Sequence, residues 1–163
     1  MKSLLILRHA KSSWKDLDLT DHDRPLNKRG KGDAPRMGEL LKREHLVPDT
    51  IISSSAIRAR ATAEAVAKAS GYKGEIISNS SLYAAEPQAY IDALHGISDD
   101  HARALVIGHN PGLEELVEML TSEFHVMPTC ALAHIKLRVQ SWVDIDYKTK
   151  GRLAMMWQPR DGT

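Results

Sequence analysis

Short apolar runs alternate with longer helix-like segments along this chain, and this alternation limits most strongly the folds that it can adopt. The runs at 3–8, 49–54 and 103–109 have the length and composition of buried strands, and each is followed by a segment with helical patterning. Such alternation is typical of domains in which helices cover a central sheet of parallel strands. We therefore predict a three-layer α/β/α fold, of the α/β class, with an open, mostly parallel sheet.

The side-chain pattern places the helices and the remaining strands. An alanine-rich segment at 54–70 predicts a helix that Ser54 or Ser55 can cap, and two further helices are expected at 87–96 and 111–122. An earlier helix follows the first strand, and its apolar face is supplied by Met37, Leu40, Leu41 and Leu46. The remaining predicted strands are 74–80, 132–139 and 152–159. The last two can form an antiparallel pair.

The overall charge argues against nucleic acid or a membrane as the partner. The chain has 163 residues, a formal net charge of +1 and 42% hydrophobic side chains, which is ordinary for one well-buried domain. The apolar run at 4–7 is too short for a signal peptide or a membrane span. The single cysteine, Cys130, has no partner for an internal disulfide, so we expect it to be an inert small hydrophobe. We expect residues 1–163 to form one cytoplasmic domain.

Basic and imidazole side chains stand at the ends of three predicted strands. Arg8 and His9 end the first strand, Arg58 comes just after the second, and His109 ends the strand at 103–109. In open α/β sheets, ligands bind outside the carboxyl ends of the strands, so these side chains are expected to converge on one crevice. Guanidinium groups match phosphate or carboxylate oxygens, and a helix start near Asn110 can add backbone N–H donors. The pattern predicts an anion pocket.

Five motifs carry a resemblance to a known family. In chain order they are LRHAKSSW, DRPLNKRG, SSSAIRARATA, LYAAE and VIGHNPG. As a set they resemble the motifs of the histidine phosphatase superfamily, whose namesake motif is Arg-His-Gly. They are most similar to the small SixA-type branch of phosphohistidine phosphatases, in which Arg-His-Ala-Lys and Asp-Arg-Pro-Leu are usual. The resemblance covers residues 3–115 and extends less distinctly to the C-terminus.

The resemblance implies a role for each residue at the strand ends. By this likeness His9 is the nucleophile that becomes phosphorylated, and Arg8, Arg58 and His109 hold the phosphoryl oxygens. The chemistry of the side chains agrees, because an attacking imidazole must be neutral and neighbouring arginines lower its pKa. Two arginines and a second histidine can also stabilise the charge on the transferred group. We therefore expect no metal ion and no cofactor.

The proton donor for the leaving group stays open at this point. Glu86 lies near the position of a catalytic carboxylate in larger phosphomonoesterases of the superfamily, but it can equally begin a helix. The aspartate that follows the second histidine in the phytase-like branch is Asn110 here. A weakly equipped donor favours a phosphoramidate, because imidazole departs more readily than an alkoxide. Ser12 and Asn110 are candidates for phosphate binding, and Ser12 alternatively for loop capping. Arg24 is expected to pack near the site or pair there with Asp23, in a structural role that shapes the loop.

We predict that the substrate is phosphohistidine on a protein, such as a histidine-containing phosphotransfer domain. A mutase must protect its phosphoenzyme from water with covering segments, and this chain has few to spare, whereas an open site suits a protein surface. Two alternatives remain. One is a broad phosphomonoesterase acting on small phosphorylated substrates, and the other is a module that binds phosphorylated ligands without catalysis. His9 beside Arg8 argues against the module, because a pure binder gains more from a third arginine.

Overall fold

Six strands form one sheet and four α-helices cover it in the computed structural model, which describes residues 1–159. The strands are β1 Lys2–Arg8, β2 Thr50–Ser54, β3 Ile76–Asn79, β4 Arg103–Gly108, β5 Leu132–Leu137 and β6 Gly151–Trp157. The helices are α1 Lys28–Arg43, α2 Ile57–Ser70, α3 Pro87–His95 and α4 Gly112–Thr121, with short 3-10 helices η1 Asp21–Asp23, η2 Ser80–Leu82 and η3 Trp142–Asp144. None of the helices within residues 1–159 has the length and apolar character needed to cross a bilayer.

The strand order is β3-β2-β4-β1-β5-β6. The first four strands of the chain pair in parallel, while β5 runs antiparallel to β1 and β6 runs antiparallel to β5. Each parallel neighbour is reached through a helical crossover, whereas β5 and β6 are joined without one, as antiparallel strands allow. The predicted α/β fold with an open, mostly parallel sheet is confirmed, and so is the antiparallel C-terminal pair.

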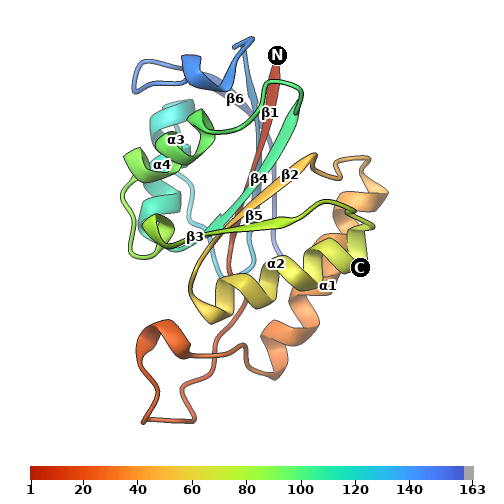
Figure 1. The fold of residues 1–163 in the computed structure, drawn as a ribbon, viewed down its shortest axis with the longest axis vertical. Helices are drawn as coiled ribbons and strands as arrows, with labels where there is room; N and C mark the ends of the chain where they lie inside the picture. Colours follow the sequence, from red (N-terminus) through yellow and green to blue (C-terminus); the bar gives the residue numbers. More distant parts are fainter. Residues whose placement is uncertain (160–163) are drawn as a thin grey trace.

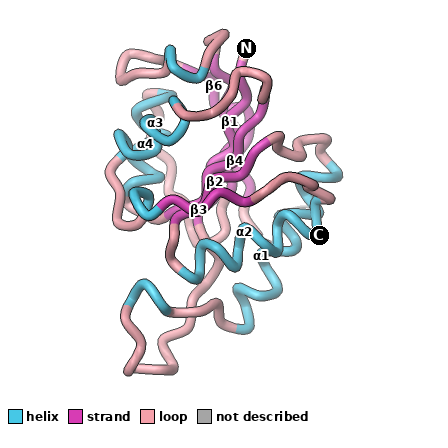
Figure 2. The backbone as a smooth tube through the Cα atoms, viewed as in Figure 1, coloured by secondary structure: helices cyan, strands magenta, loops and turns pink. Residues whose placement is uncertain are grey.

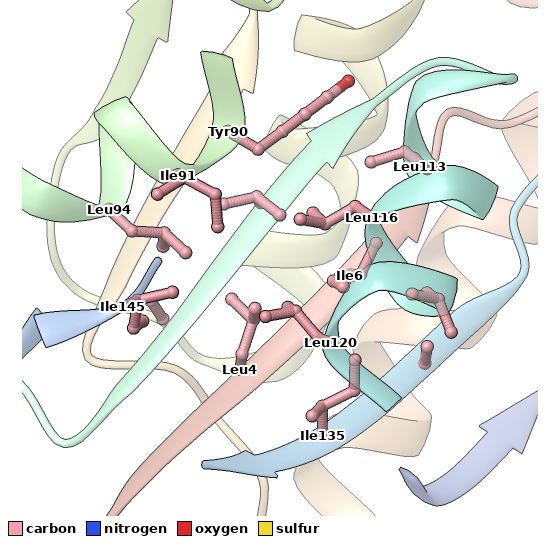
Figure 3. Close-up of a cluster of buried hydrophobic side chains, with 14 of the residues drawn as sticks. Leu4, Ile6, Tyr90, Ile91, Leu94, Leu113, Leu116, Leu120, Ile135 and Ile145 are labelled. Atoms are coloured by element: carbon pink, nitrogen blue, oxygen red, sulfur yellow. The ribbon is translucent and has the colours of Figure 1, made fainter. Parts of the chain in front are cut away.

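Two hydrophobic cores lie on opposite faces of the sheet. Successive residues of a strand point to opposite faces, so Leu4 and Ile6 pack with α3 and α4, while Leu5 and Leu7 pack with α1 and α2. Figure 1 shows these two helix pairs on either side of the sheet, and Figure 3 shows the core beneath α3 and α4. Because both faces are covered, β1 is a continuous apolar run rather than an alternating one.

Two local predictions were wrong in detail. Helix α1 ends at Arg43, so Leu46 reaches the core from the following turn rather than from the helix. Helix α2 has Ala56 as its N-cap residue, with no side-chain cap. The Ser54 hydroxyl instead accepts the Ala56 N–H at 3.2 Å, and Ser55 lies within hydrogen-bond distance of another loop. Both serines are therefore engaged before the helix begins.

The long loop between β1 and α1 extends from the carboxyl ends of the parallel strands, as Figures 1 and 2 show. It contains η1 and returns to the start of α1, where the Asn27 side chain accepts the Gly30 N–H and caps the helix. Ser12 forms an isolated antiparallel bridge with Leu26, which joins the two ends of this loop. The loop thus borders the edge of the sheet at which the sequence predicts an anion pocket.

Candidate active site

The register of the sheet brings the predicted site residues together. Arg8 on β1 pairs with Gly108 on β4, so His9 and His109 follow at the same edge, with ring centroids 5.1 Å apart. Arg58 arrives from the first turn of α2, and its Nε lies 3.4 Å from His9 Nε2. A pocket of about 260 Å³ is lined by Arg8, His9, Lys11, Ser12, Trp14, Arg24, Arg58, His109, Asn110 and Thr129. No carboxylate lines it, and its position confirms that the strand ends converge.

The hydrogen bonds of His9 define which ring nitrogen is unprotonated. Its Nδ1 lies 2.8 Å from the carbonyl oxygen of Ala10, which can only accept, so Nδ1 carries the hydrogen. Nε2 is therefore unprotonated, and its lone pair accepts a long hydrogen bond from Arg58 Nε at 3.4 Å. Thr62 holds this geometry, because its hydroxyl accepts the Ala10 N–H at 2.9 Å and donates to the Arg58 carbonyl at 2.7 Å. The ring is thus fixed with Nε2 toward the cations.

Burial keeps His9 neutral. The side chain is 6% exposed, and burial lowers its pKa to about 3, with smaller contributions from His109, Arg58 and Arg8. The hydrogen bond to Ala10 acts in the opposite direction but does not offset burial. His9 is therefore an uncharged imidazole at any physiological pH, as a nucleophile requires.

His109 has one engaged and one unpartnered ring nitrogen. Its Nε2 lies within hydrogen-bond distance of the Ser54 hydroxyl, at 2.8 Å, and the same hydroxyl accepts the Ala56 N–H. The other ring nitrogen, Nδ1, is buried and has no hydrogen-bond partner within residues 1–159. Burial, followed by Arg58, lowers the His109 pKa to about 4. His109 is therefore a neutral imidazole that lines the pocket beside His9.

Arg8 is anchored at one end only. Its Nη1 donates to the Met127 carbonyl at 3.1 Å, while its Nε is buried and has no partner among the described residues. Burial lowers the pKa of Arg8, yet a guanidinium remains charged in proteins. The Asn110 amide also donates to the Met127 carbonyl, at 2.8 Å, and the Met127 N–H donates to Glu114. This loop therefore positions Arg8 and Asn110 together at the pocket wall.

A carboxylate that the sequence analysis missed holds the second arginine. Arg58 Nη1 donates to the Asp21 carbonyl at 2.6 Å, and Nη2 donates to Asp21 Oδ2 at 3.0 Å. The Tyr83 hydroxyl donates to the same carboxylate at 2.6 Å, and Arg24 Nη1 donates to it at 2.8 Å. The Tyr83 hydrogen bond, with those from the arginines, holds the Asp21 pKa far below its usual range. Asp21 is therefore a permanent anion that orients Arg58 rather than a proton donor.

The predicted pairing of Arg24 with Asp23 is wrong. The 3-10 turn η1 directs Asp21 toward Arg24, while Asp23 contacts His22. Arg24 also donates to the Ser13 carbonyl at 3.1 Å and to the Ser12 hydroxyl. Its guanidinium stacks 3.3 Å from the centre of the Trp14 ring, so it ties the loop together at the pocket mouth.

Glu86 lies outside this pocket. It is exposed and is the N-cap residue of α3, which begins at Pro87, so the expected helix start is confirmed. It lines a neighbouring pocket of about 290 Å³, which shares His109 and Asn110 with the first one. Its catalytic role stays a prediction.

Two further observations describe what the site contains. Within residues 1–159, no three histidine, cysteine, aspartate or glutamate side chains gather in a way that could hold a metal ion. Cys130 is buried, and burial raises its pKa to about 12, so its thiol is unreactive at neutral pH. The polar side chains that line the pocket around His9 carry imidazole, guanidinium, ammonium, hydroxyl and amide groups.

Known proteins are similar to this chain in sequence and in fold. A model of the histidine phosphatase superfamily (branch 1) matches residues 4–82. An uncharacterized chloroplastic protein of Arabidopsis thaliana is 33% identical over 156 residues, which are 86% of this chain and 69% of that protein. An uncharacterized protein of Mycobacterium tuberculosis is 34% identical over 116 residues, 71% of this chain and 70% of its own length. This chain belongs to the histidine phosphatase superfamily.

Solved structures refine the assignment. A candidate phosphohistidine phosphatase SixA from Agrobacterium tumefaciens is 27% identical, with a TM-score of 0.82 over 97% of this chain and 98% of that one. The protein histidine phosphatase SixA complexed with tungstate has the same fold, with a TM-score of 0.83 over 98% of both chains at 22% identity. Within the superfamily this chain is of the SixA type, as the motifs predict, and this relationship supports phosphatase activity.

Proposed function

We propose that this protein is a phosphohistidine phosphatase in which His9 is the nucleophile. The observation that carries the proposal is the hydrogen bond from His9 Nδ1 to the Ala10 carbonyl, because it leaves a neutral Nε2 directed at the guanidinium of Arg58. A group that only bound phosphate would gain nothing from an unprotonated nitrogen among cations. An attacking group requires one.

The reaction follows from the positions of the side chains. Nε2 of His9 attacks phosphorus in line with the bond to the leaving group, that bond breaks, and a phosphohistidine enzyme forms. Arg8, Arg58 and His109 stabilise the equatorial oxygens, where charge is concentrated. Water then attacks the phosphohistidine, releases inorganic phosphate and restores His9. Ser12 and Asn110 line the same pocket and are proposed as further phosphate contacts.

The protonation of the carboxylates favours a phosphoramidate substrate. Asp21 contacts the cluster but stays ionised, because Tyr83, Arg24 and Arg58 all donate to it. Glu86 is outside the pocket that contains His9. An alkoxide leaving group needs a proton from a protonated carboxyl group. The imidazole of phosphohistidine is a better leaving group, because its second ring nitrogen can carry a proton before the bond to phosphorus breaks. Phosphohistidine is therefore the substrate class that this site is equipped to cleave.

We also propose that the reaction needs no metal. The pocket offers Arg8, Arg58, Lys11 and Arg24 as cations, and these supply the positive charge that a metal would otherwise contribute. A protein is the proposed carrier of the phosphohistidine, in line with the protein histidine phosphatase to which the fold is similar.

The test compares two substrates in the presence of a chelator. Phosphate release is measured from a phosphorylated histidine-containing phosphotransfer domain and from p-nitrophenyl phosphate, with wild type, His9→Ala and the control His45→Asn, which alters an exposed histidine outside the pocket. We expect release from the phosphoprotein that is lost only in His9→Ala. Acid-labile phosphate should be trapped on His9 when turnover is quenched.

Other results would change the assignment. Release from p-nitrophenyl phosphate alone would make the protein a small-molecule phosphomonoesterase. Release from neither substrate, with phosphate still bound, would make it a binding module. Loss of activity in chelator would remove the proposal that the arginines are sufficient without a metal.

A further inference from the structure

A second group of cations lies on the sheet, remote from His9. Strand register places four residues in one row, with Arg103 on β4 opposite Ser3 on β1, Ser3 opposite Lys136 on β5, and Lys136 opposite Arg152 on β6. Residues that pair directly across strands share a face, so the row points to one side. Ser3 precedes Arg8 by five positions on β1, which is ~17 Å along an extended strand. A ligand in this row cannot touch the nucleophile.

Two residues of this row, Lys136 and Arg152, line a cavity where β5 ends and β6 begins. The cavity has a volume of about 380 Å³, and its lining residues are Met1, Lys136, Arg138, Lys150, Gly151 and Arg152. Four of the six carry positive charge and none is a carboxylate. Lys150 donates to the Met119 carbonyl at 2.8 Å. Among residues 1–159, no hydrogen bond or ion pair engages the charged groups of Lys136, Arg138 or Arg152.

This arrangement is unfavourable in the free protein. Lys136 and Arg152 lie directly opposite each other, and like charges in that position destabilise a sheet. The positive charges of this row also act on His134, which is buried on β5 and shares a hydrogen bond with the Ser3 hydroxyl at 2.7 Å. Burial lowers the His134 pKa to about 4, with added contributions from Arg103, Lys136 and Arg152. A bound anion would relieve both effects.

We propose that this cavity, with the unpaired cations Lys136, Arg138 and Arg152, forms a second anion site, which binds a small ligand carrying two or more phosphate groups. Neighbouring strands are ~5 Å apart and alternate residues of a strand are ~7 Å apart, so the unpaired cations span more than one phosphate. Arginine forks match phosphate oxygens, and the cavity volume falls within the range of small-ligand pockets. The proposal is independent of the reaction at His9.

Histidine resonances can locate the ligand. Inorganic tripolyphosphate is titrated into wild type while the imidazole signals of His134, His9 and His109 are followed by NMR. We expect the His134 signal to shift and its pKa to rise. Calorimetry should show binding weakened about tenfold in Lys136→Gln and in Arg152→Gln, the effect of losing one charge-assisted contact. The control Lys68→Gln removes an exposed cation on α2 and should bind as wild type.

The same experiment can overturn the proposal. Tripolyphosphate can also enter the catalytic pocket, and His9 and His109 report that binding separately. Shifts confined to His9 and His109 would mean that the second site does not exist. Equal binding by Lys136→Gln, Arg152→Gln and Lys68→Gln would show only diffuse attraction. Free of ligand, Lys136→Gln should have a higher Tm than wild type, because the opposed charges are gone, and a lower Tm would contradict that repulsion.

Discussion

Mild acid should destabilise this protein, because three histidines are buried in the neutral form. The pKa is about 3 for His9 and about 4 for His109 and His134, with burial as the largest cause in each case. Their pKa in the unfolded chain is about 6.5, so the unfolded state binds more protons below that pH. The contribution that these neutral buried histidines make to the free energy of unfolding is intact above pH 6.5 and is lost as the pH falls toward 4.

The size of the loss follows from the linkage relation. Each histidine loses about 1.4 kcal/mol per pH unit below 6.5, which is about 2 kcal/mol at pH 5. Together, His9, His109 and His134 should lower the free energy of unfolding by about 6 kcal/mol between pH 7 and pH 5, a large part of the stability of a typical domain. Carboxylates contribute little in this window, because they titrate mainly below it.

Urea unfolding at the two pH values measures the loss. His134→Gln and His109→Gln should each lose about 2 kcal/mol less than wild type on going from pH 7 to pH 5. His45→Asn replaces an exposed histidine and serves as the control, with the wild-type loss expected. If His134→Gln and His109→Gln were as sensitive to pH as wild type, the argument from neutral burial would be refuted.

Three further predictions concern the pocket. Arg58→Ala should lower kcat and raise KM, reducing kcat/KM by about 100-fold or more, since it removes charge that acts on the transition state; unchanged steady-state kinetics would exclude Arg58 from the site. Tyr83→Phe should raise the Asp21 pKa toward the ordinary range, as followed by carboxyl NMR, and should reduce kcat/KM less than Arg58→Ala, because the arginine itself remains. Glu86→Gln should leave phosphohistidine hydrolysis unchanged, and equal slowing of phosphoester and phosphoramidate cleavage would contradict the leaving-group argument.

The strand-end rule predicted much of the candidate site. Arg8 ends β1, which pairs in parallel with β4, and His9 and His109 come directly after these two strands. Their positions in the chain are therefore sufficient to predict that they lie at one edge of the sheet. Arg58 follows from the same logic, since it lies in the first turn after β2. The reactive tautomer of His9 was not accessible in this way, because it depends on a carbonyl that only the turn after β1 brings into place.

Contacts between loops were beyond the sequence. Asp21 and Tyr83 are 62 positions apart, and their hydrogen bond depends on how the long loop returns to the sheet. The LYAAE motif contains Tyr83 and was the one available signal. Adjacency in the sequence predicts that Arg24 pairs with Asp23, but the 3-10 turn η1 places the Asp21 carboxylate against Arg24 instead. Local patterns do not specify such turns.

The hydrogen bond between His9 and Ala10 is made to the main chain, and this has a consequence for the evolution of the fold. A carbonyl cannot be removed by a point mutation, so the orientation of the nucleophile is inherited with the turn that follows β1. Residues at the mouth of the pocket, such as Lys11, Trp14 and Thr129, can then be exchanged without altering the reacting nitrogen. Substitutions at the mouth of the pocket can therefore change which partners the protein binds, while the orientation of His9 stays the same.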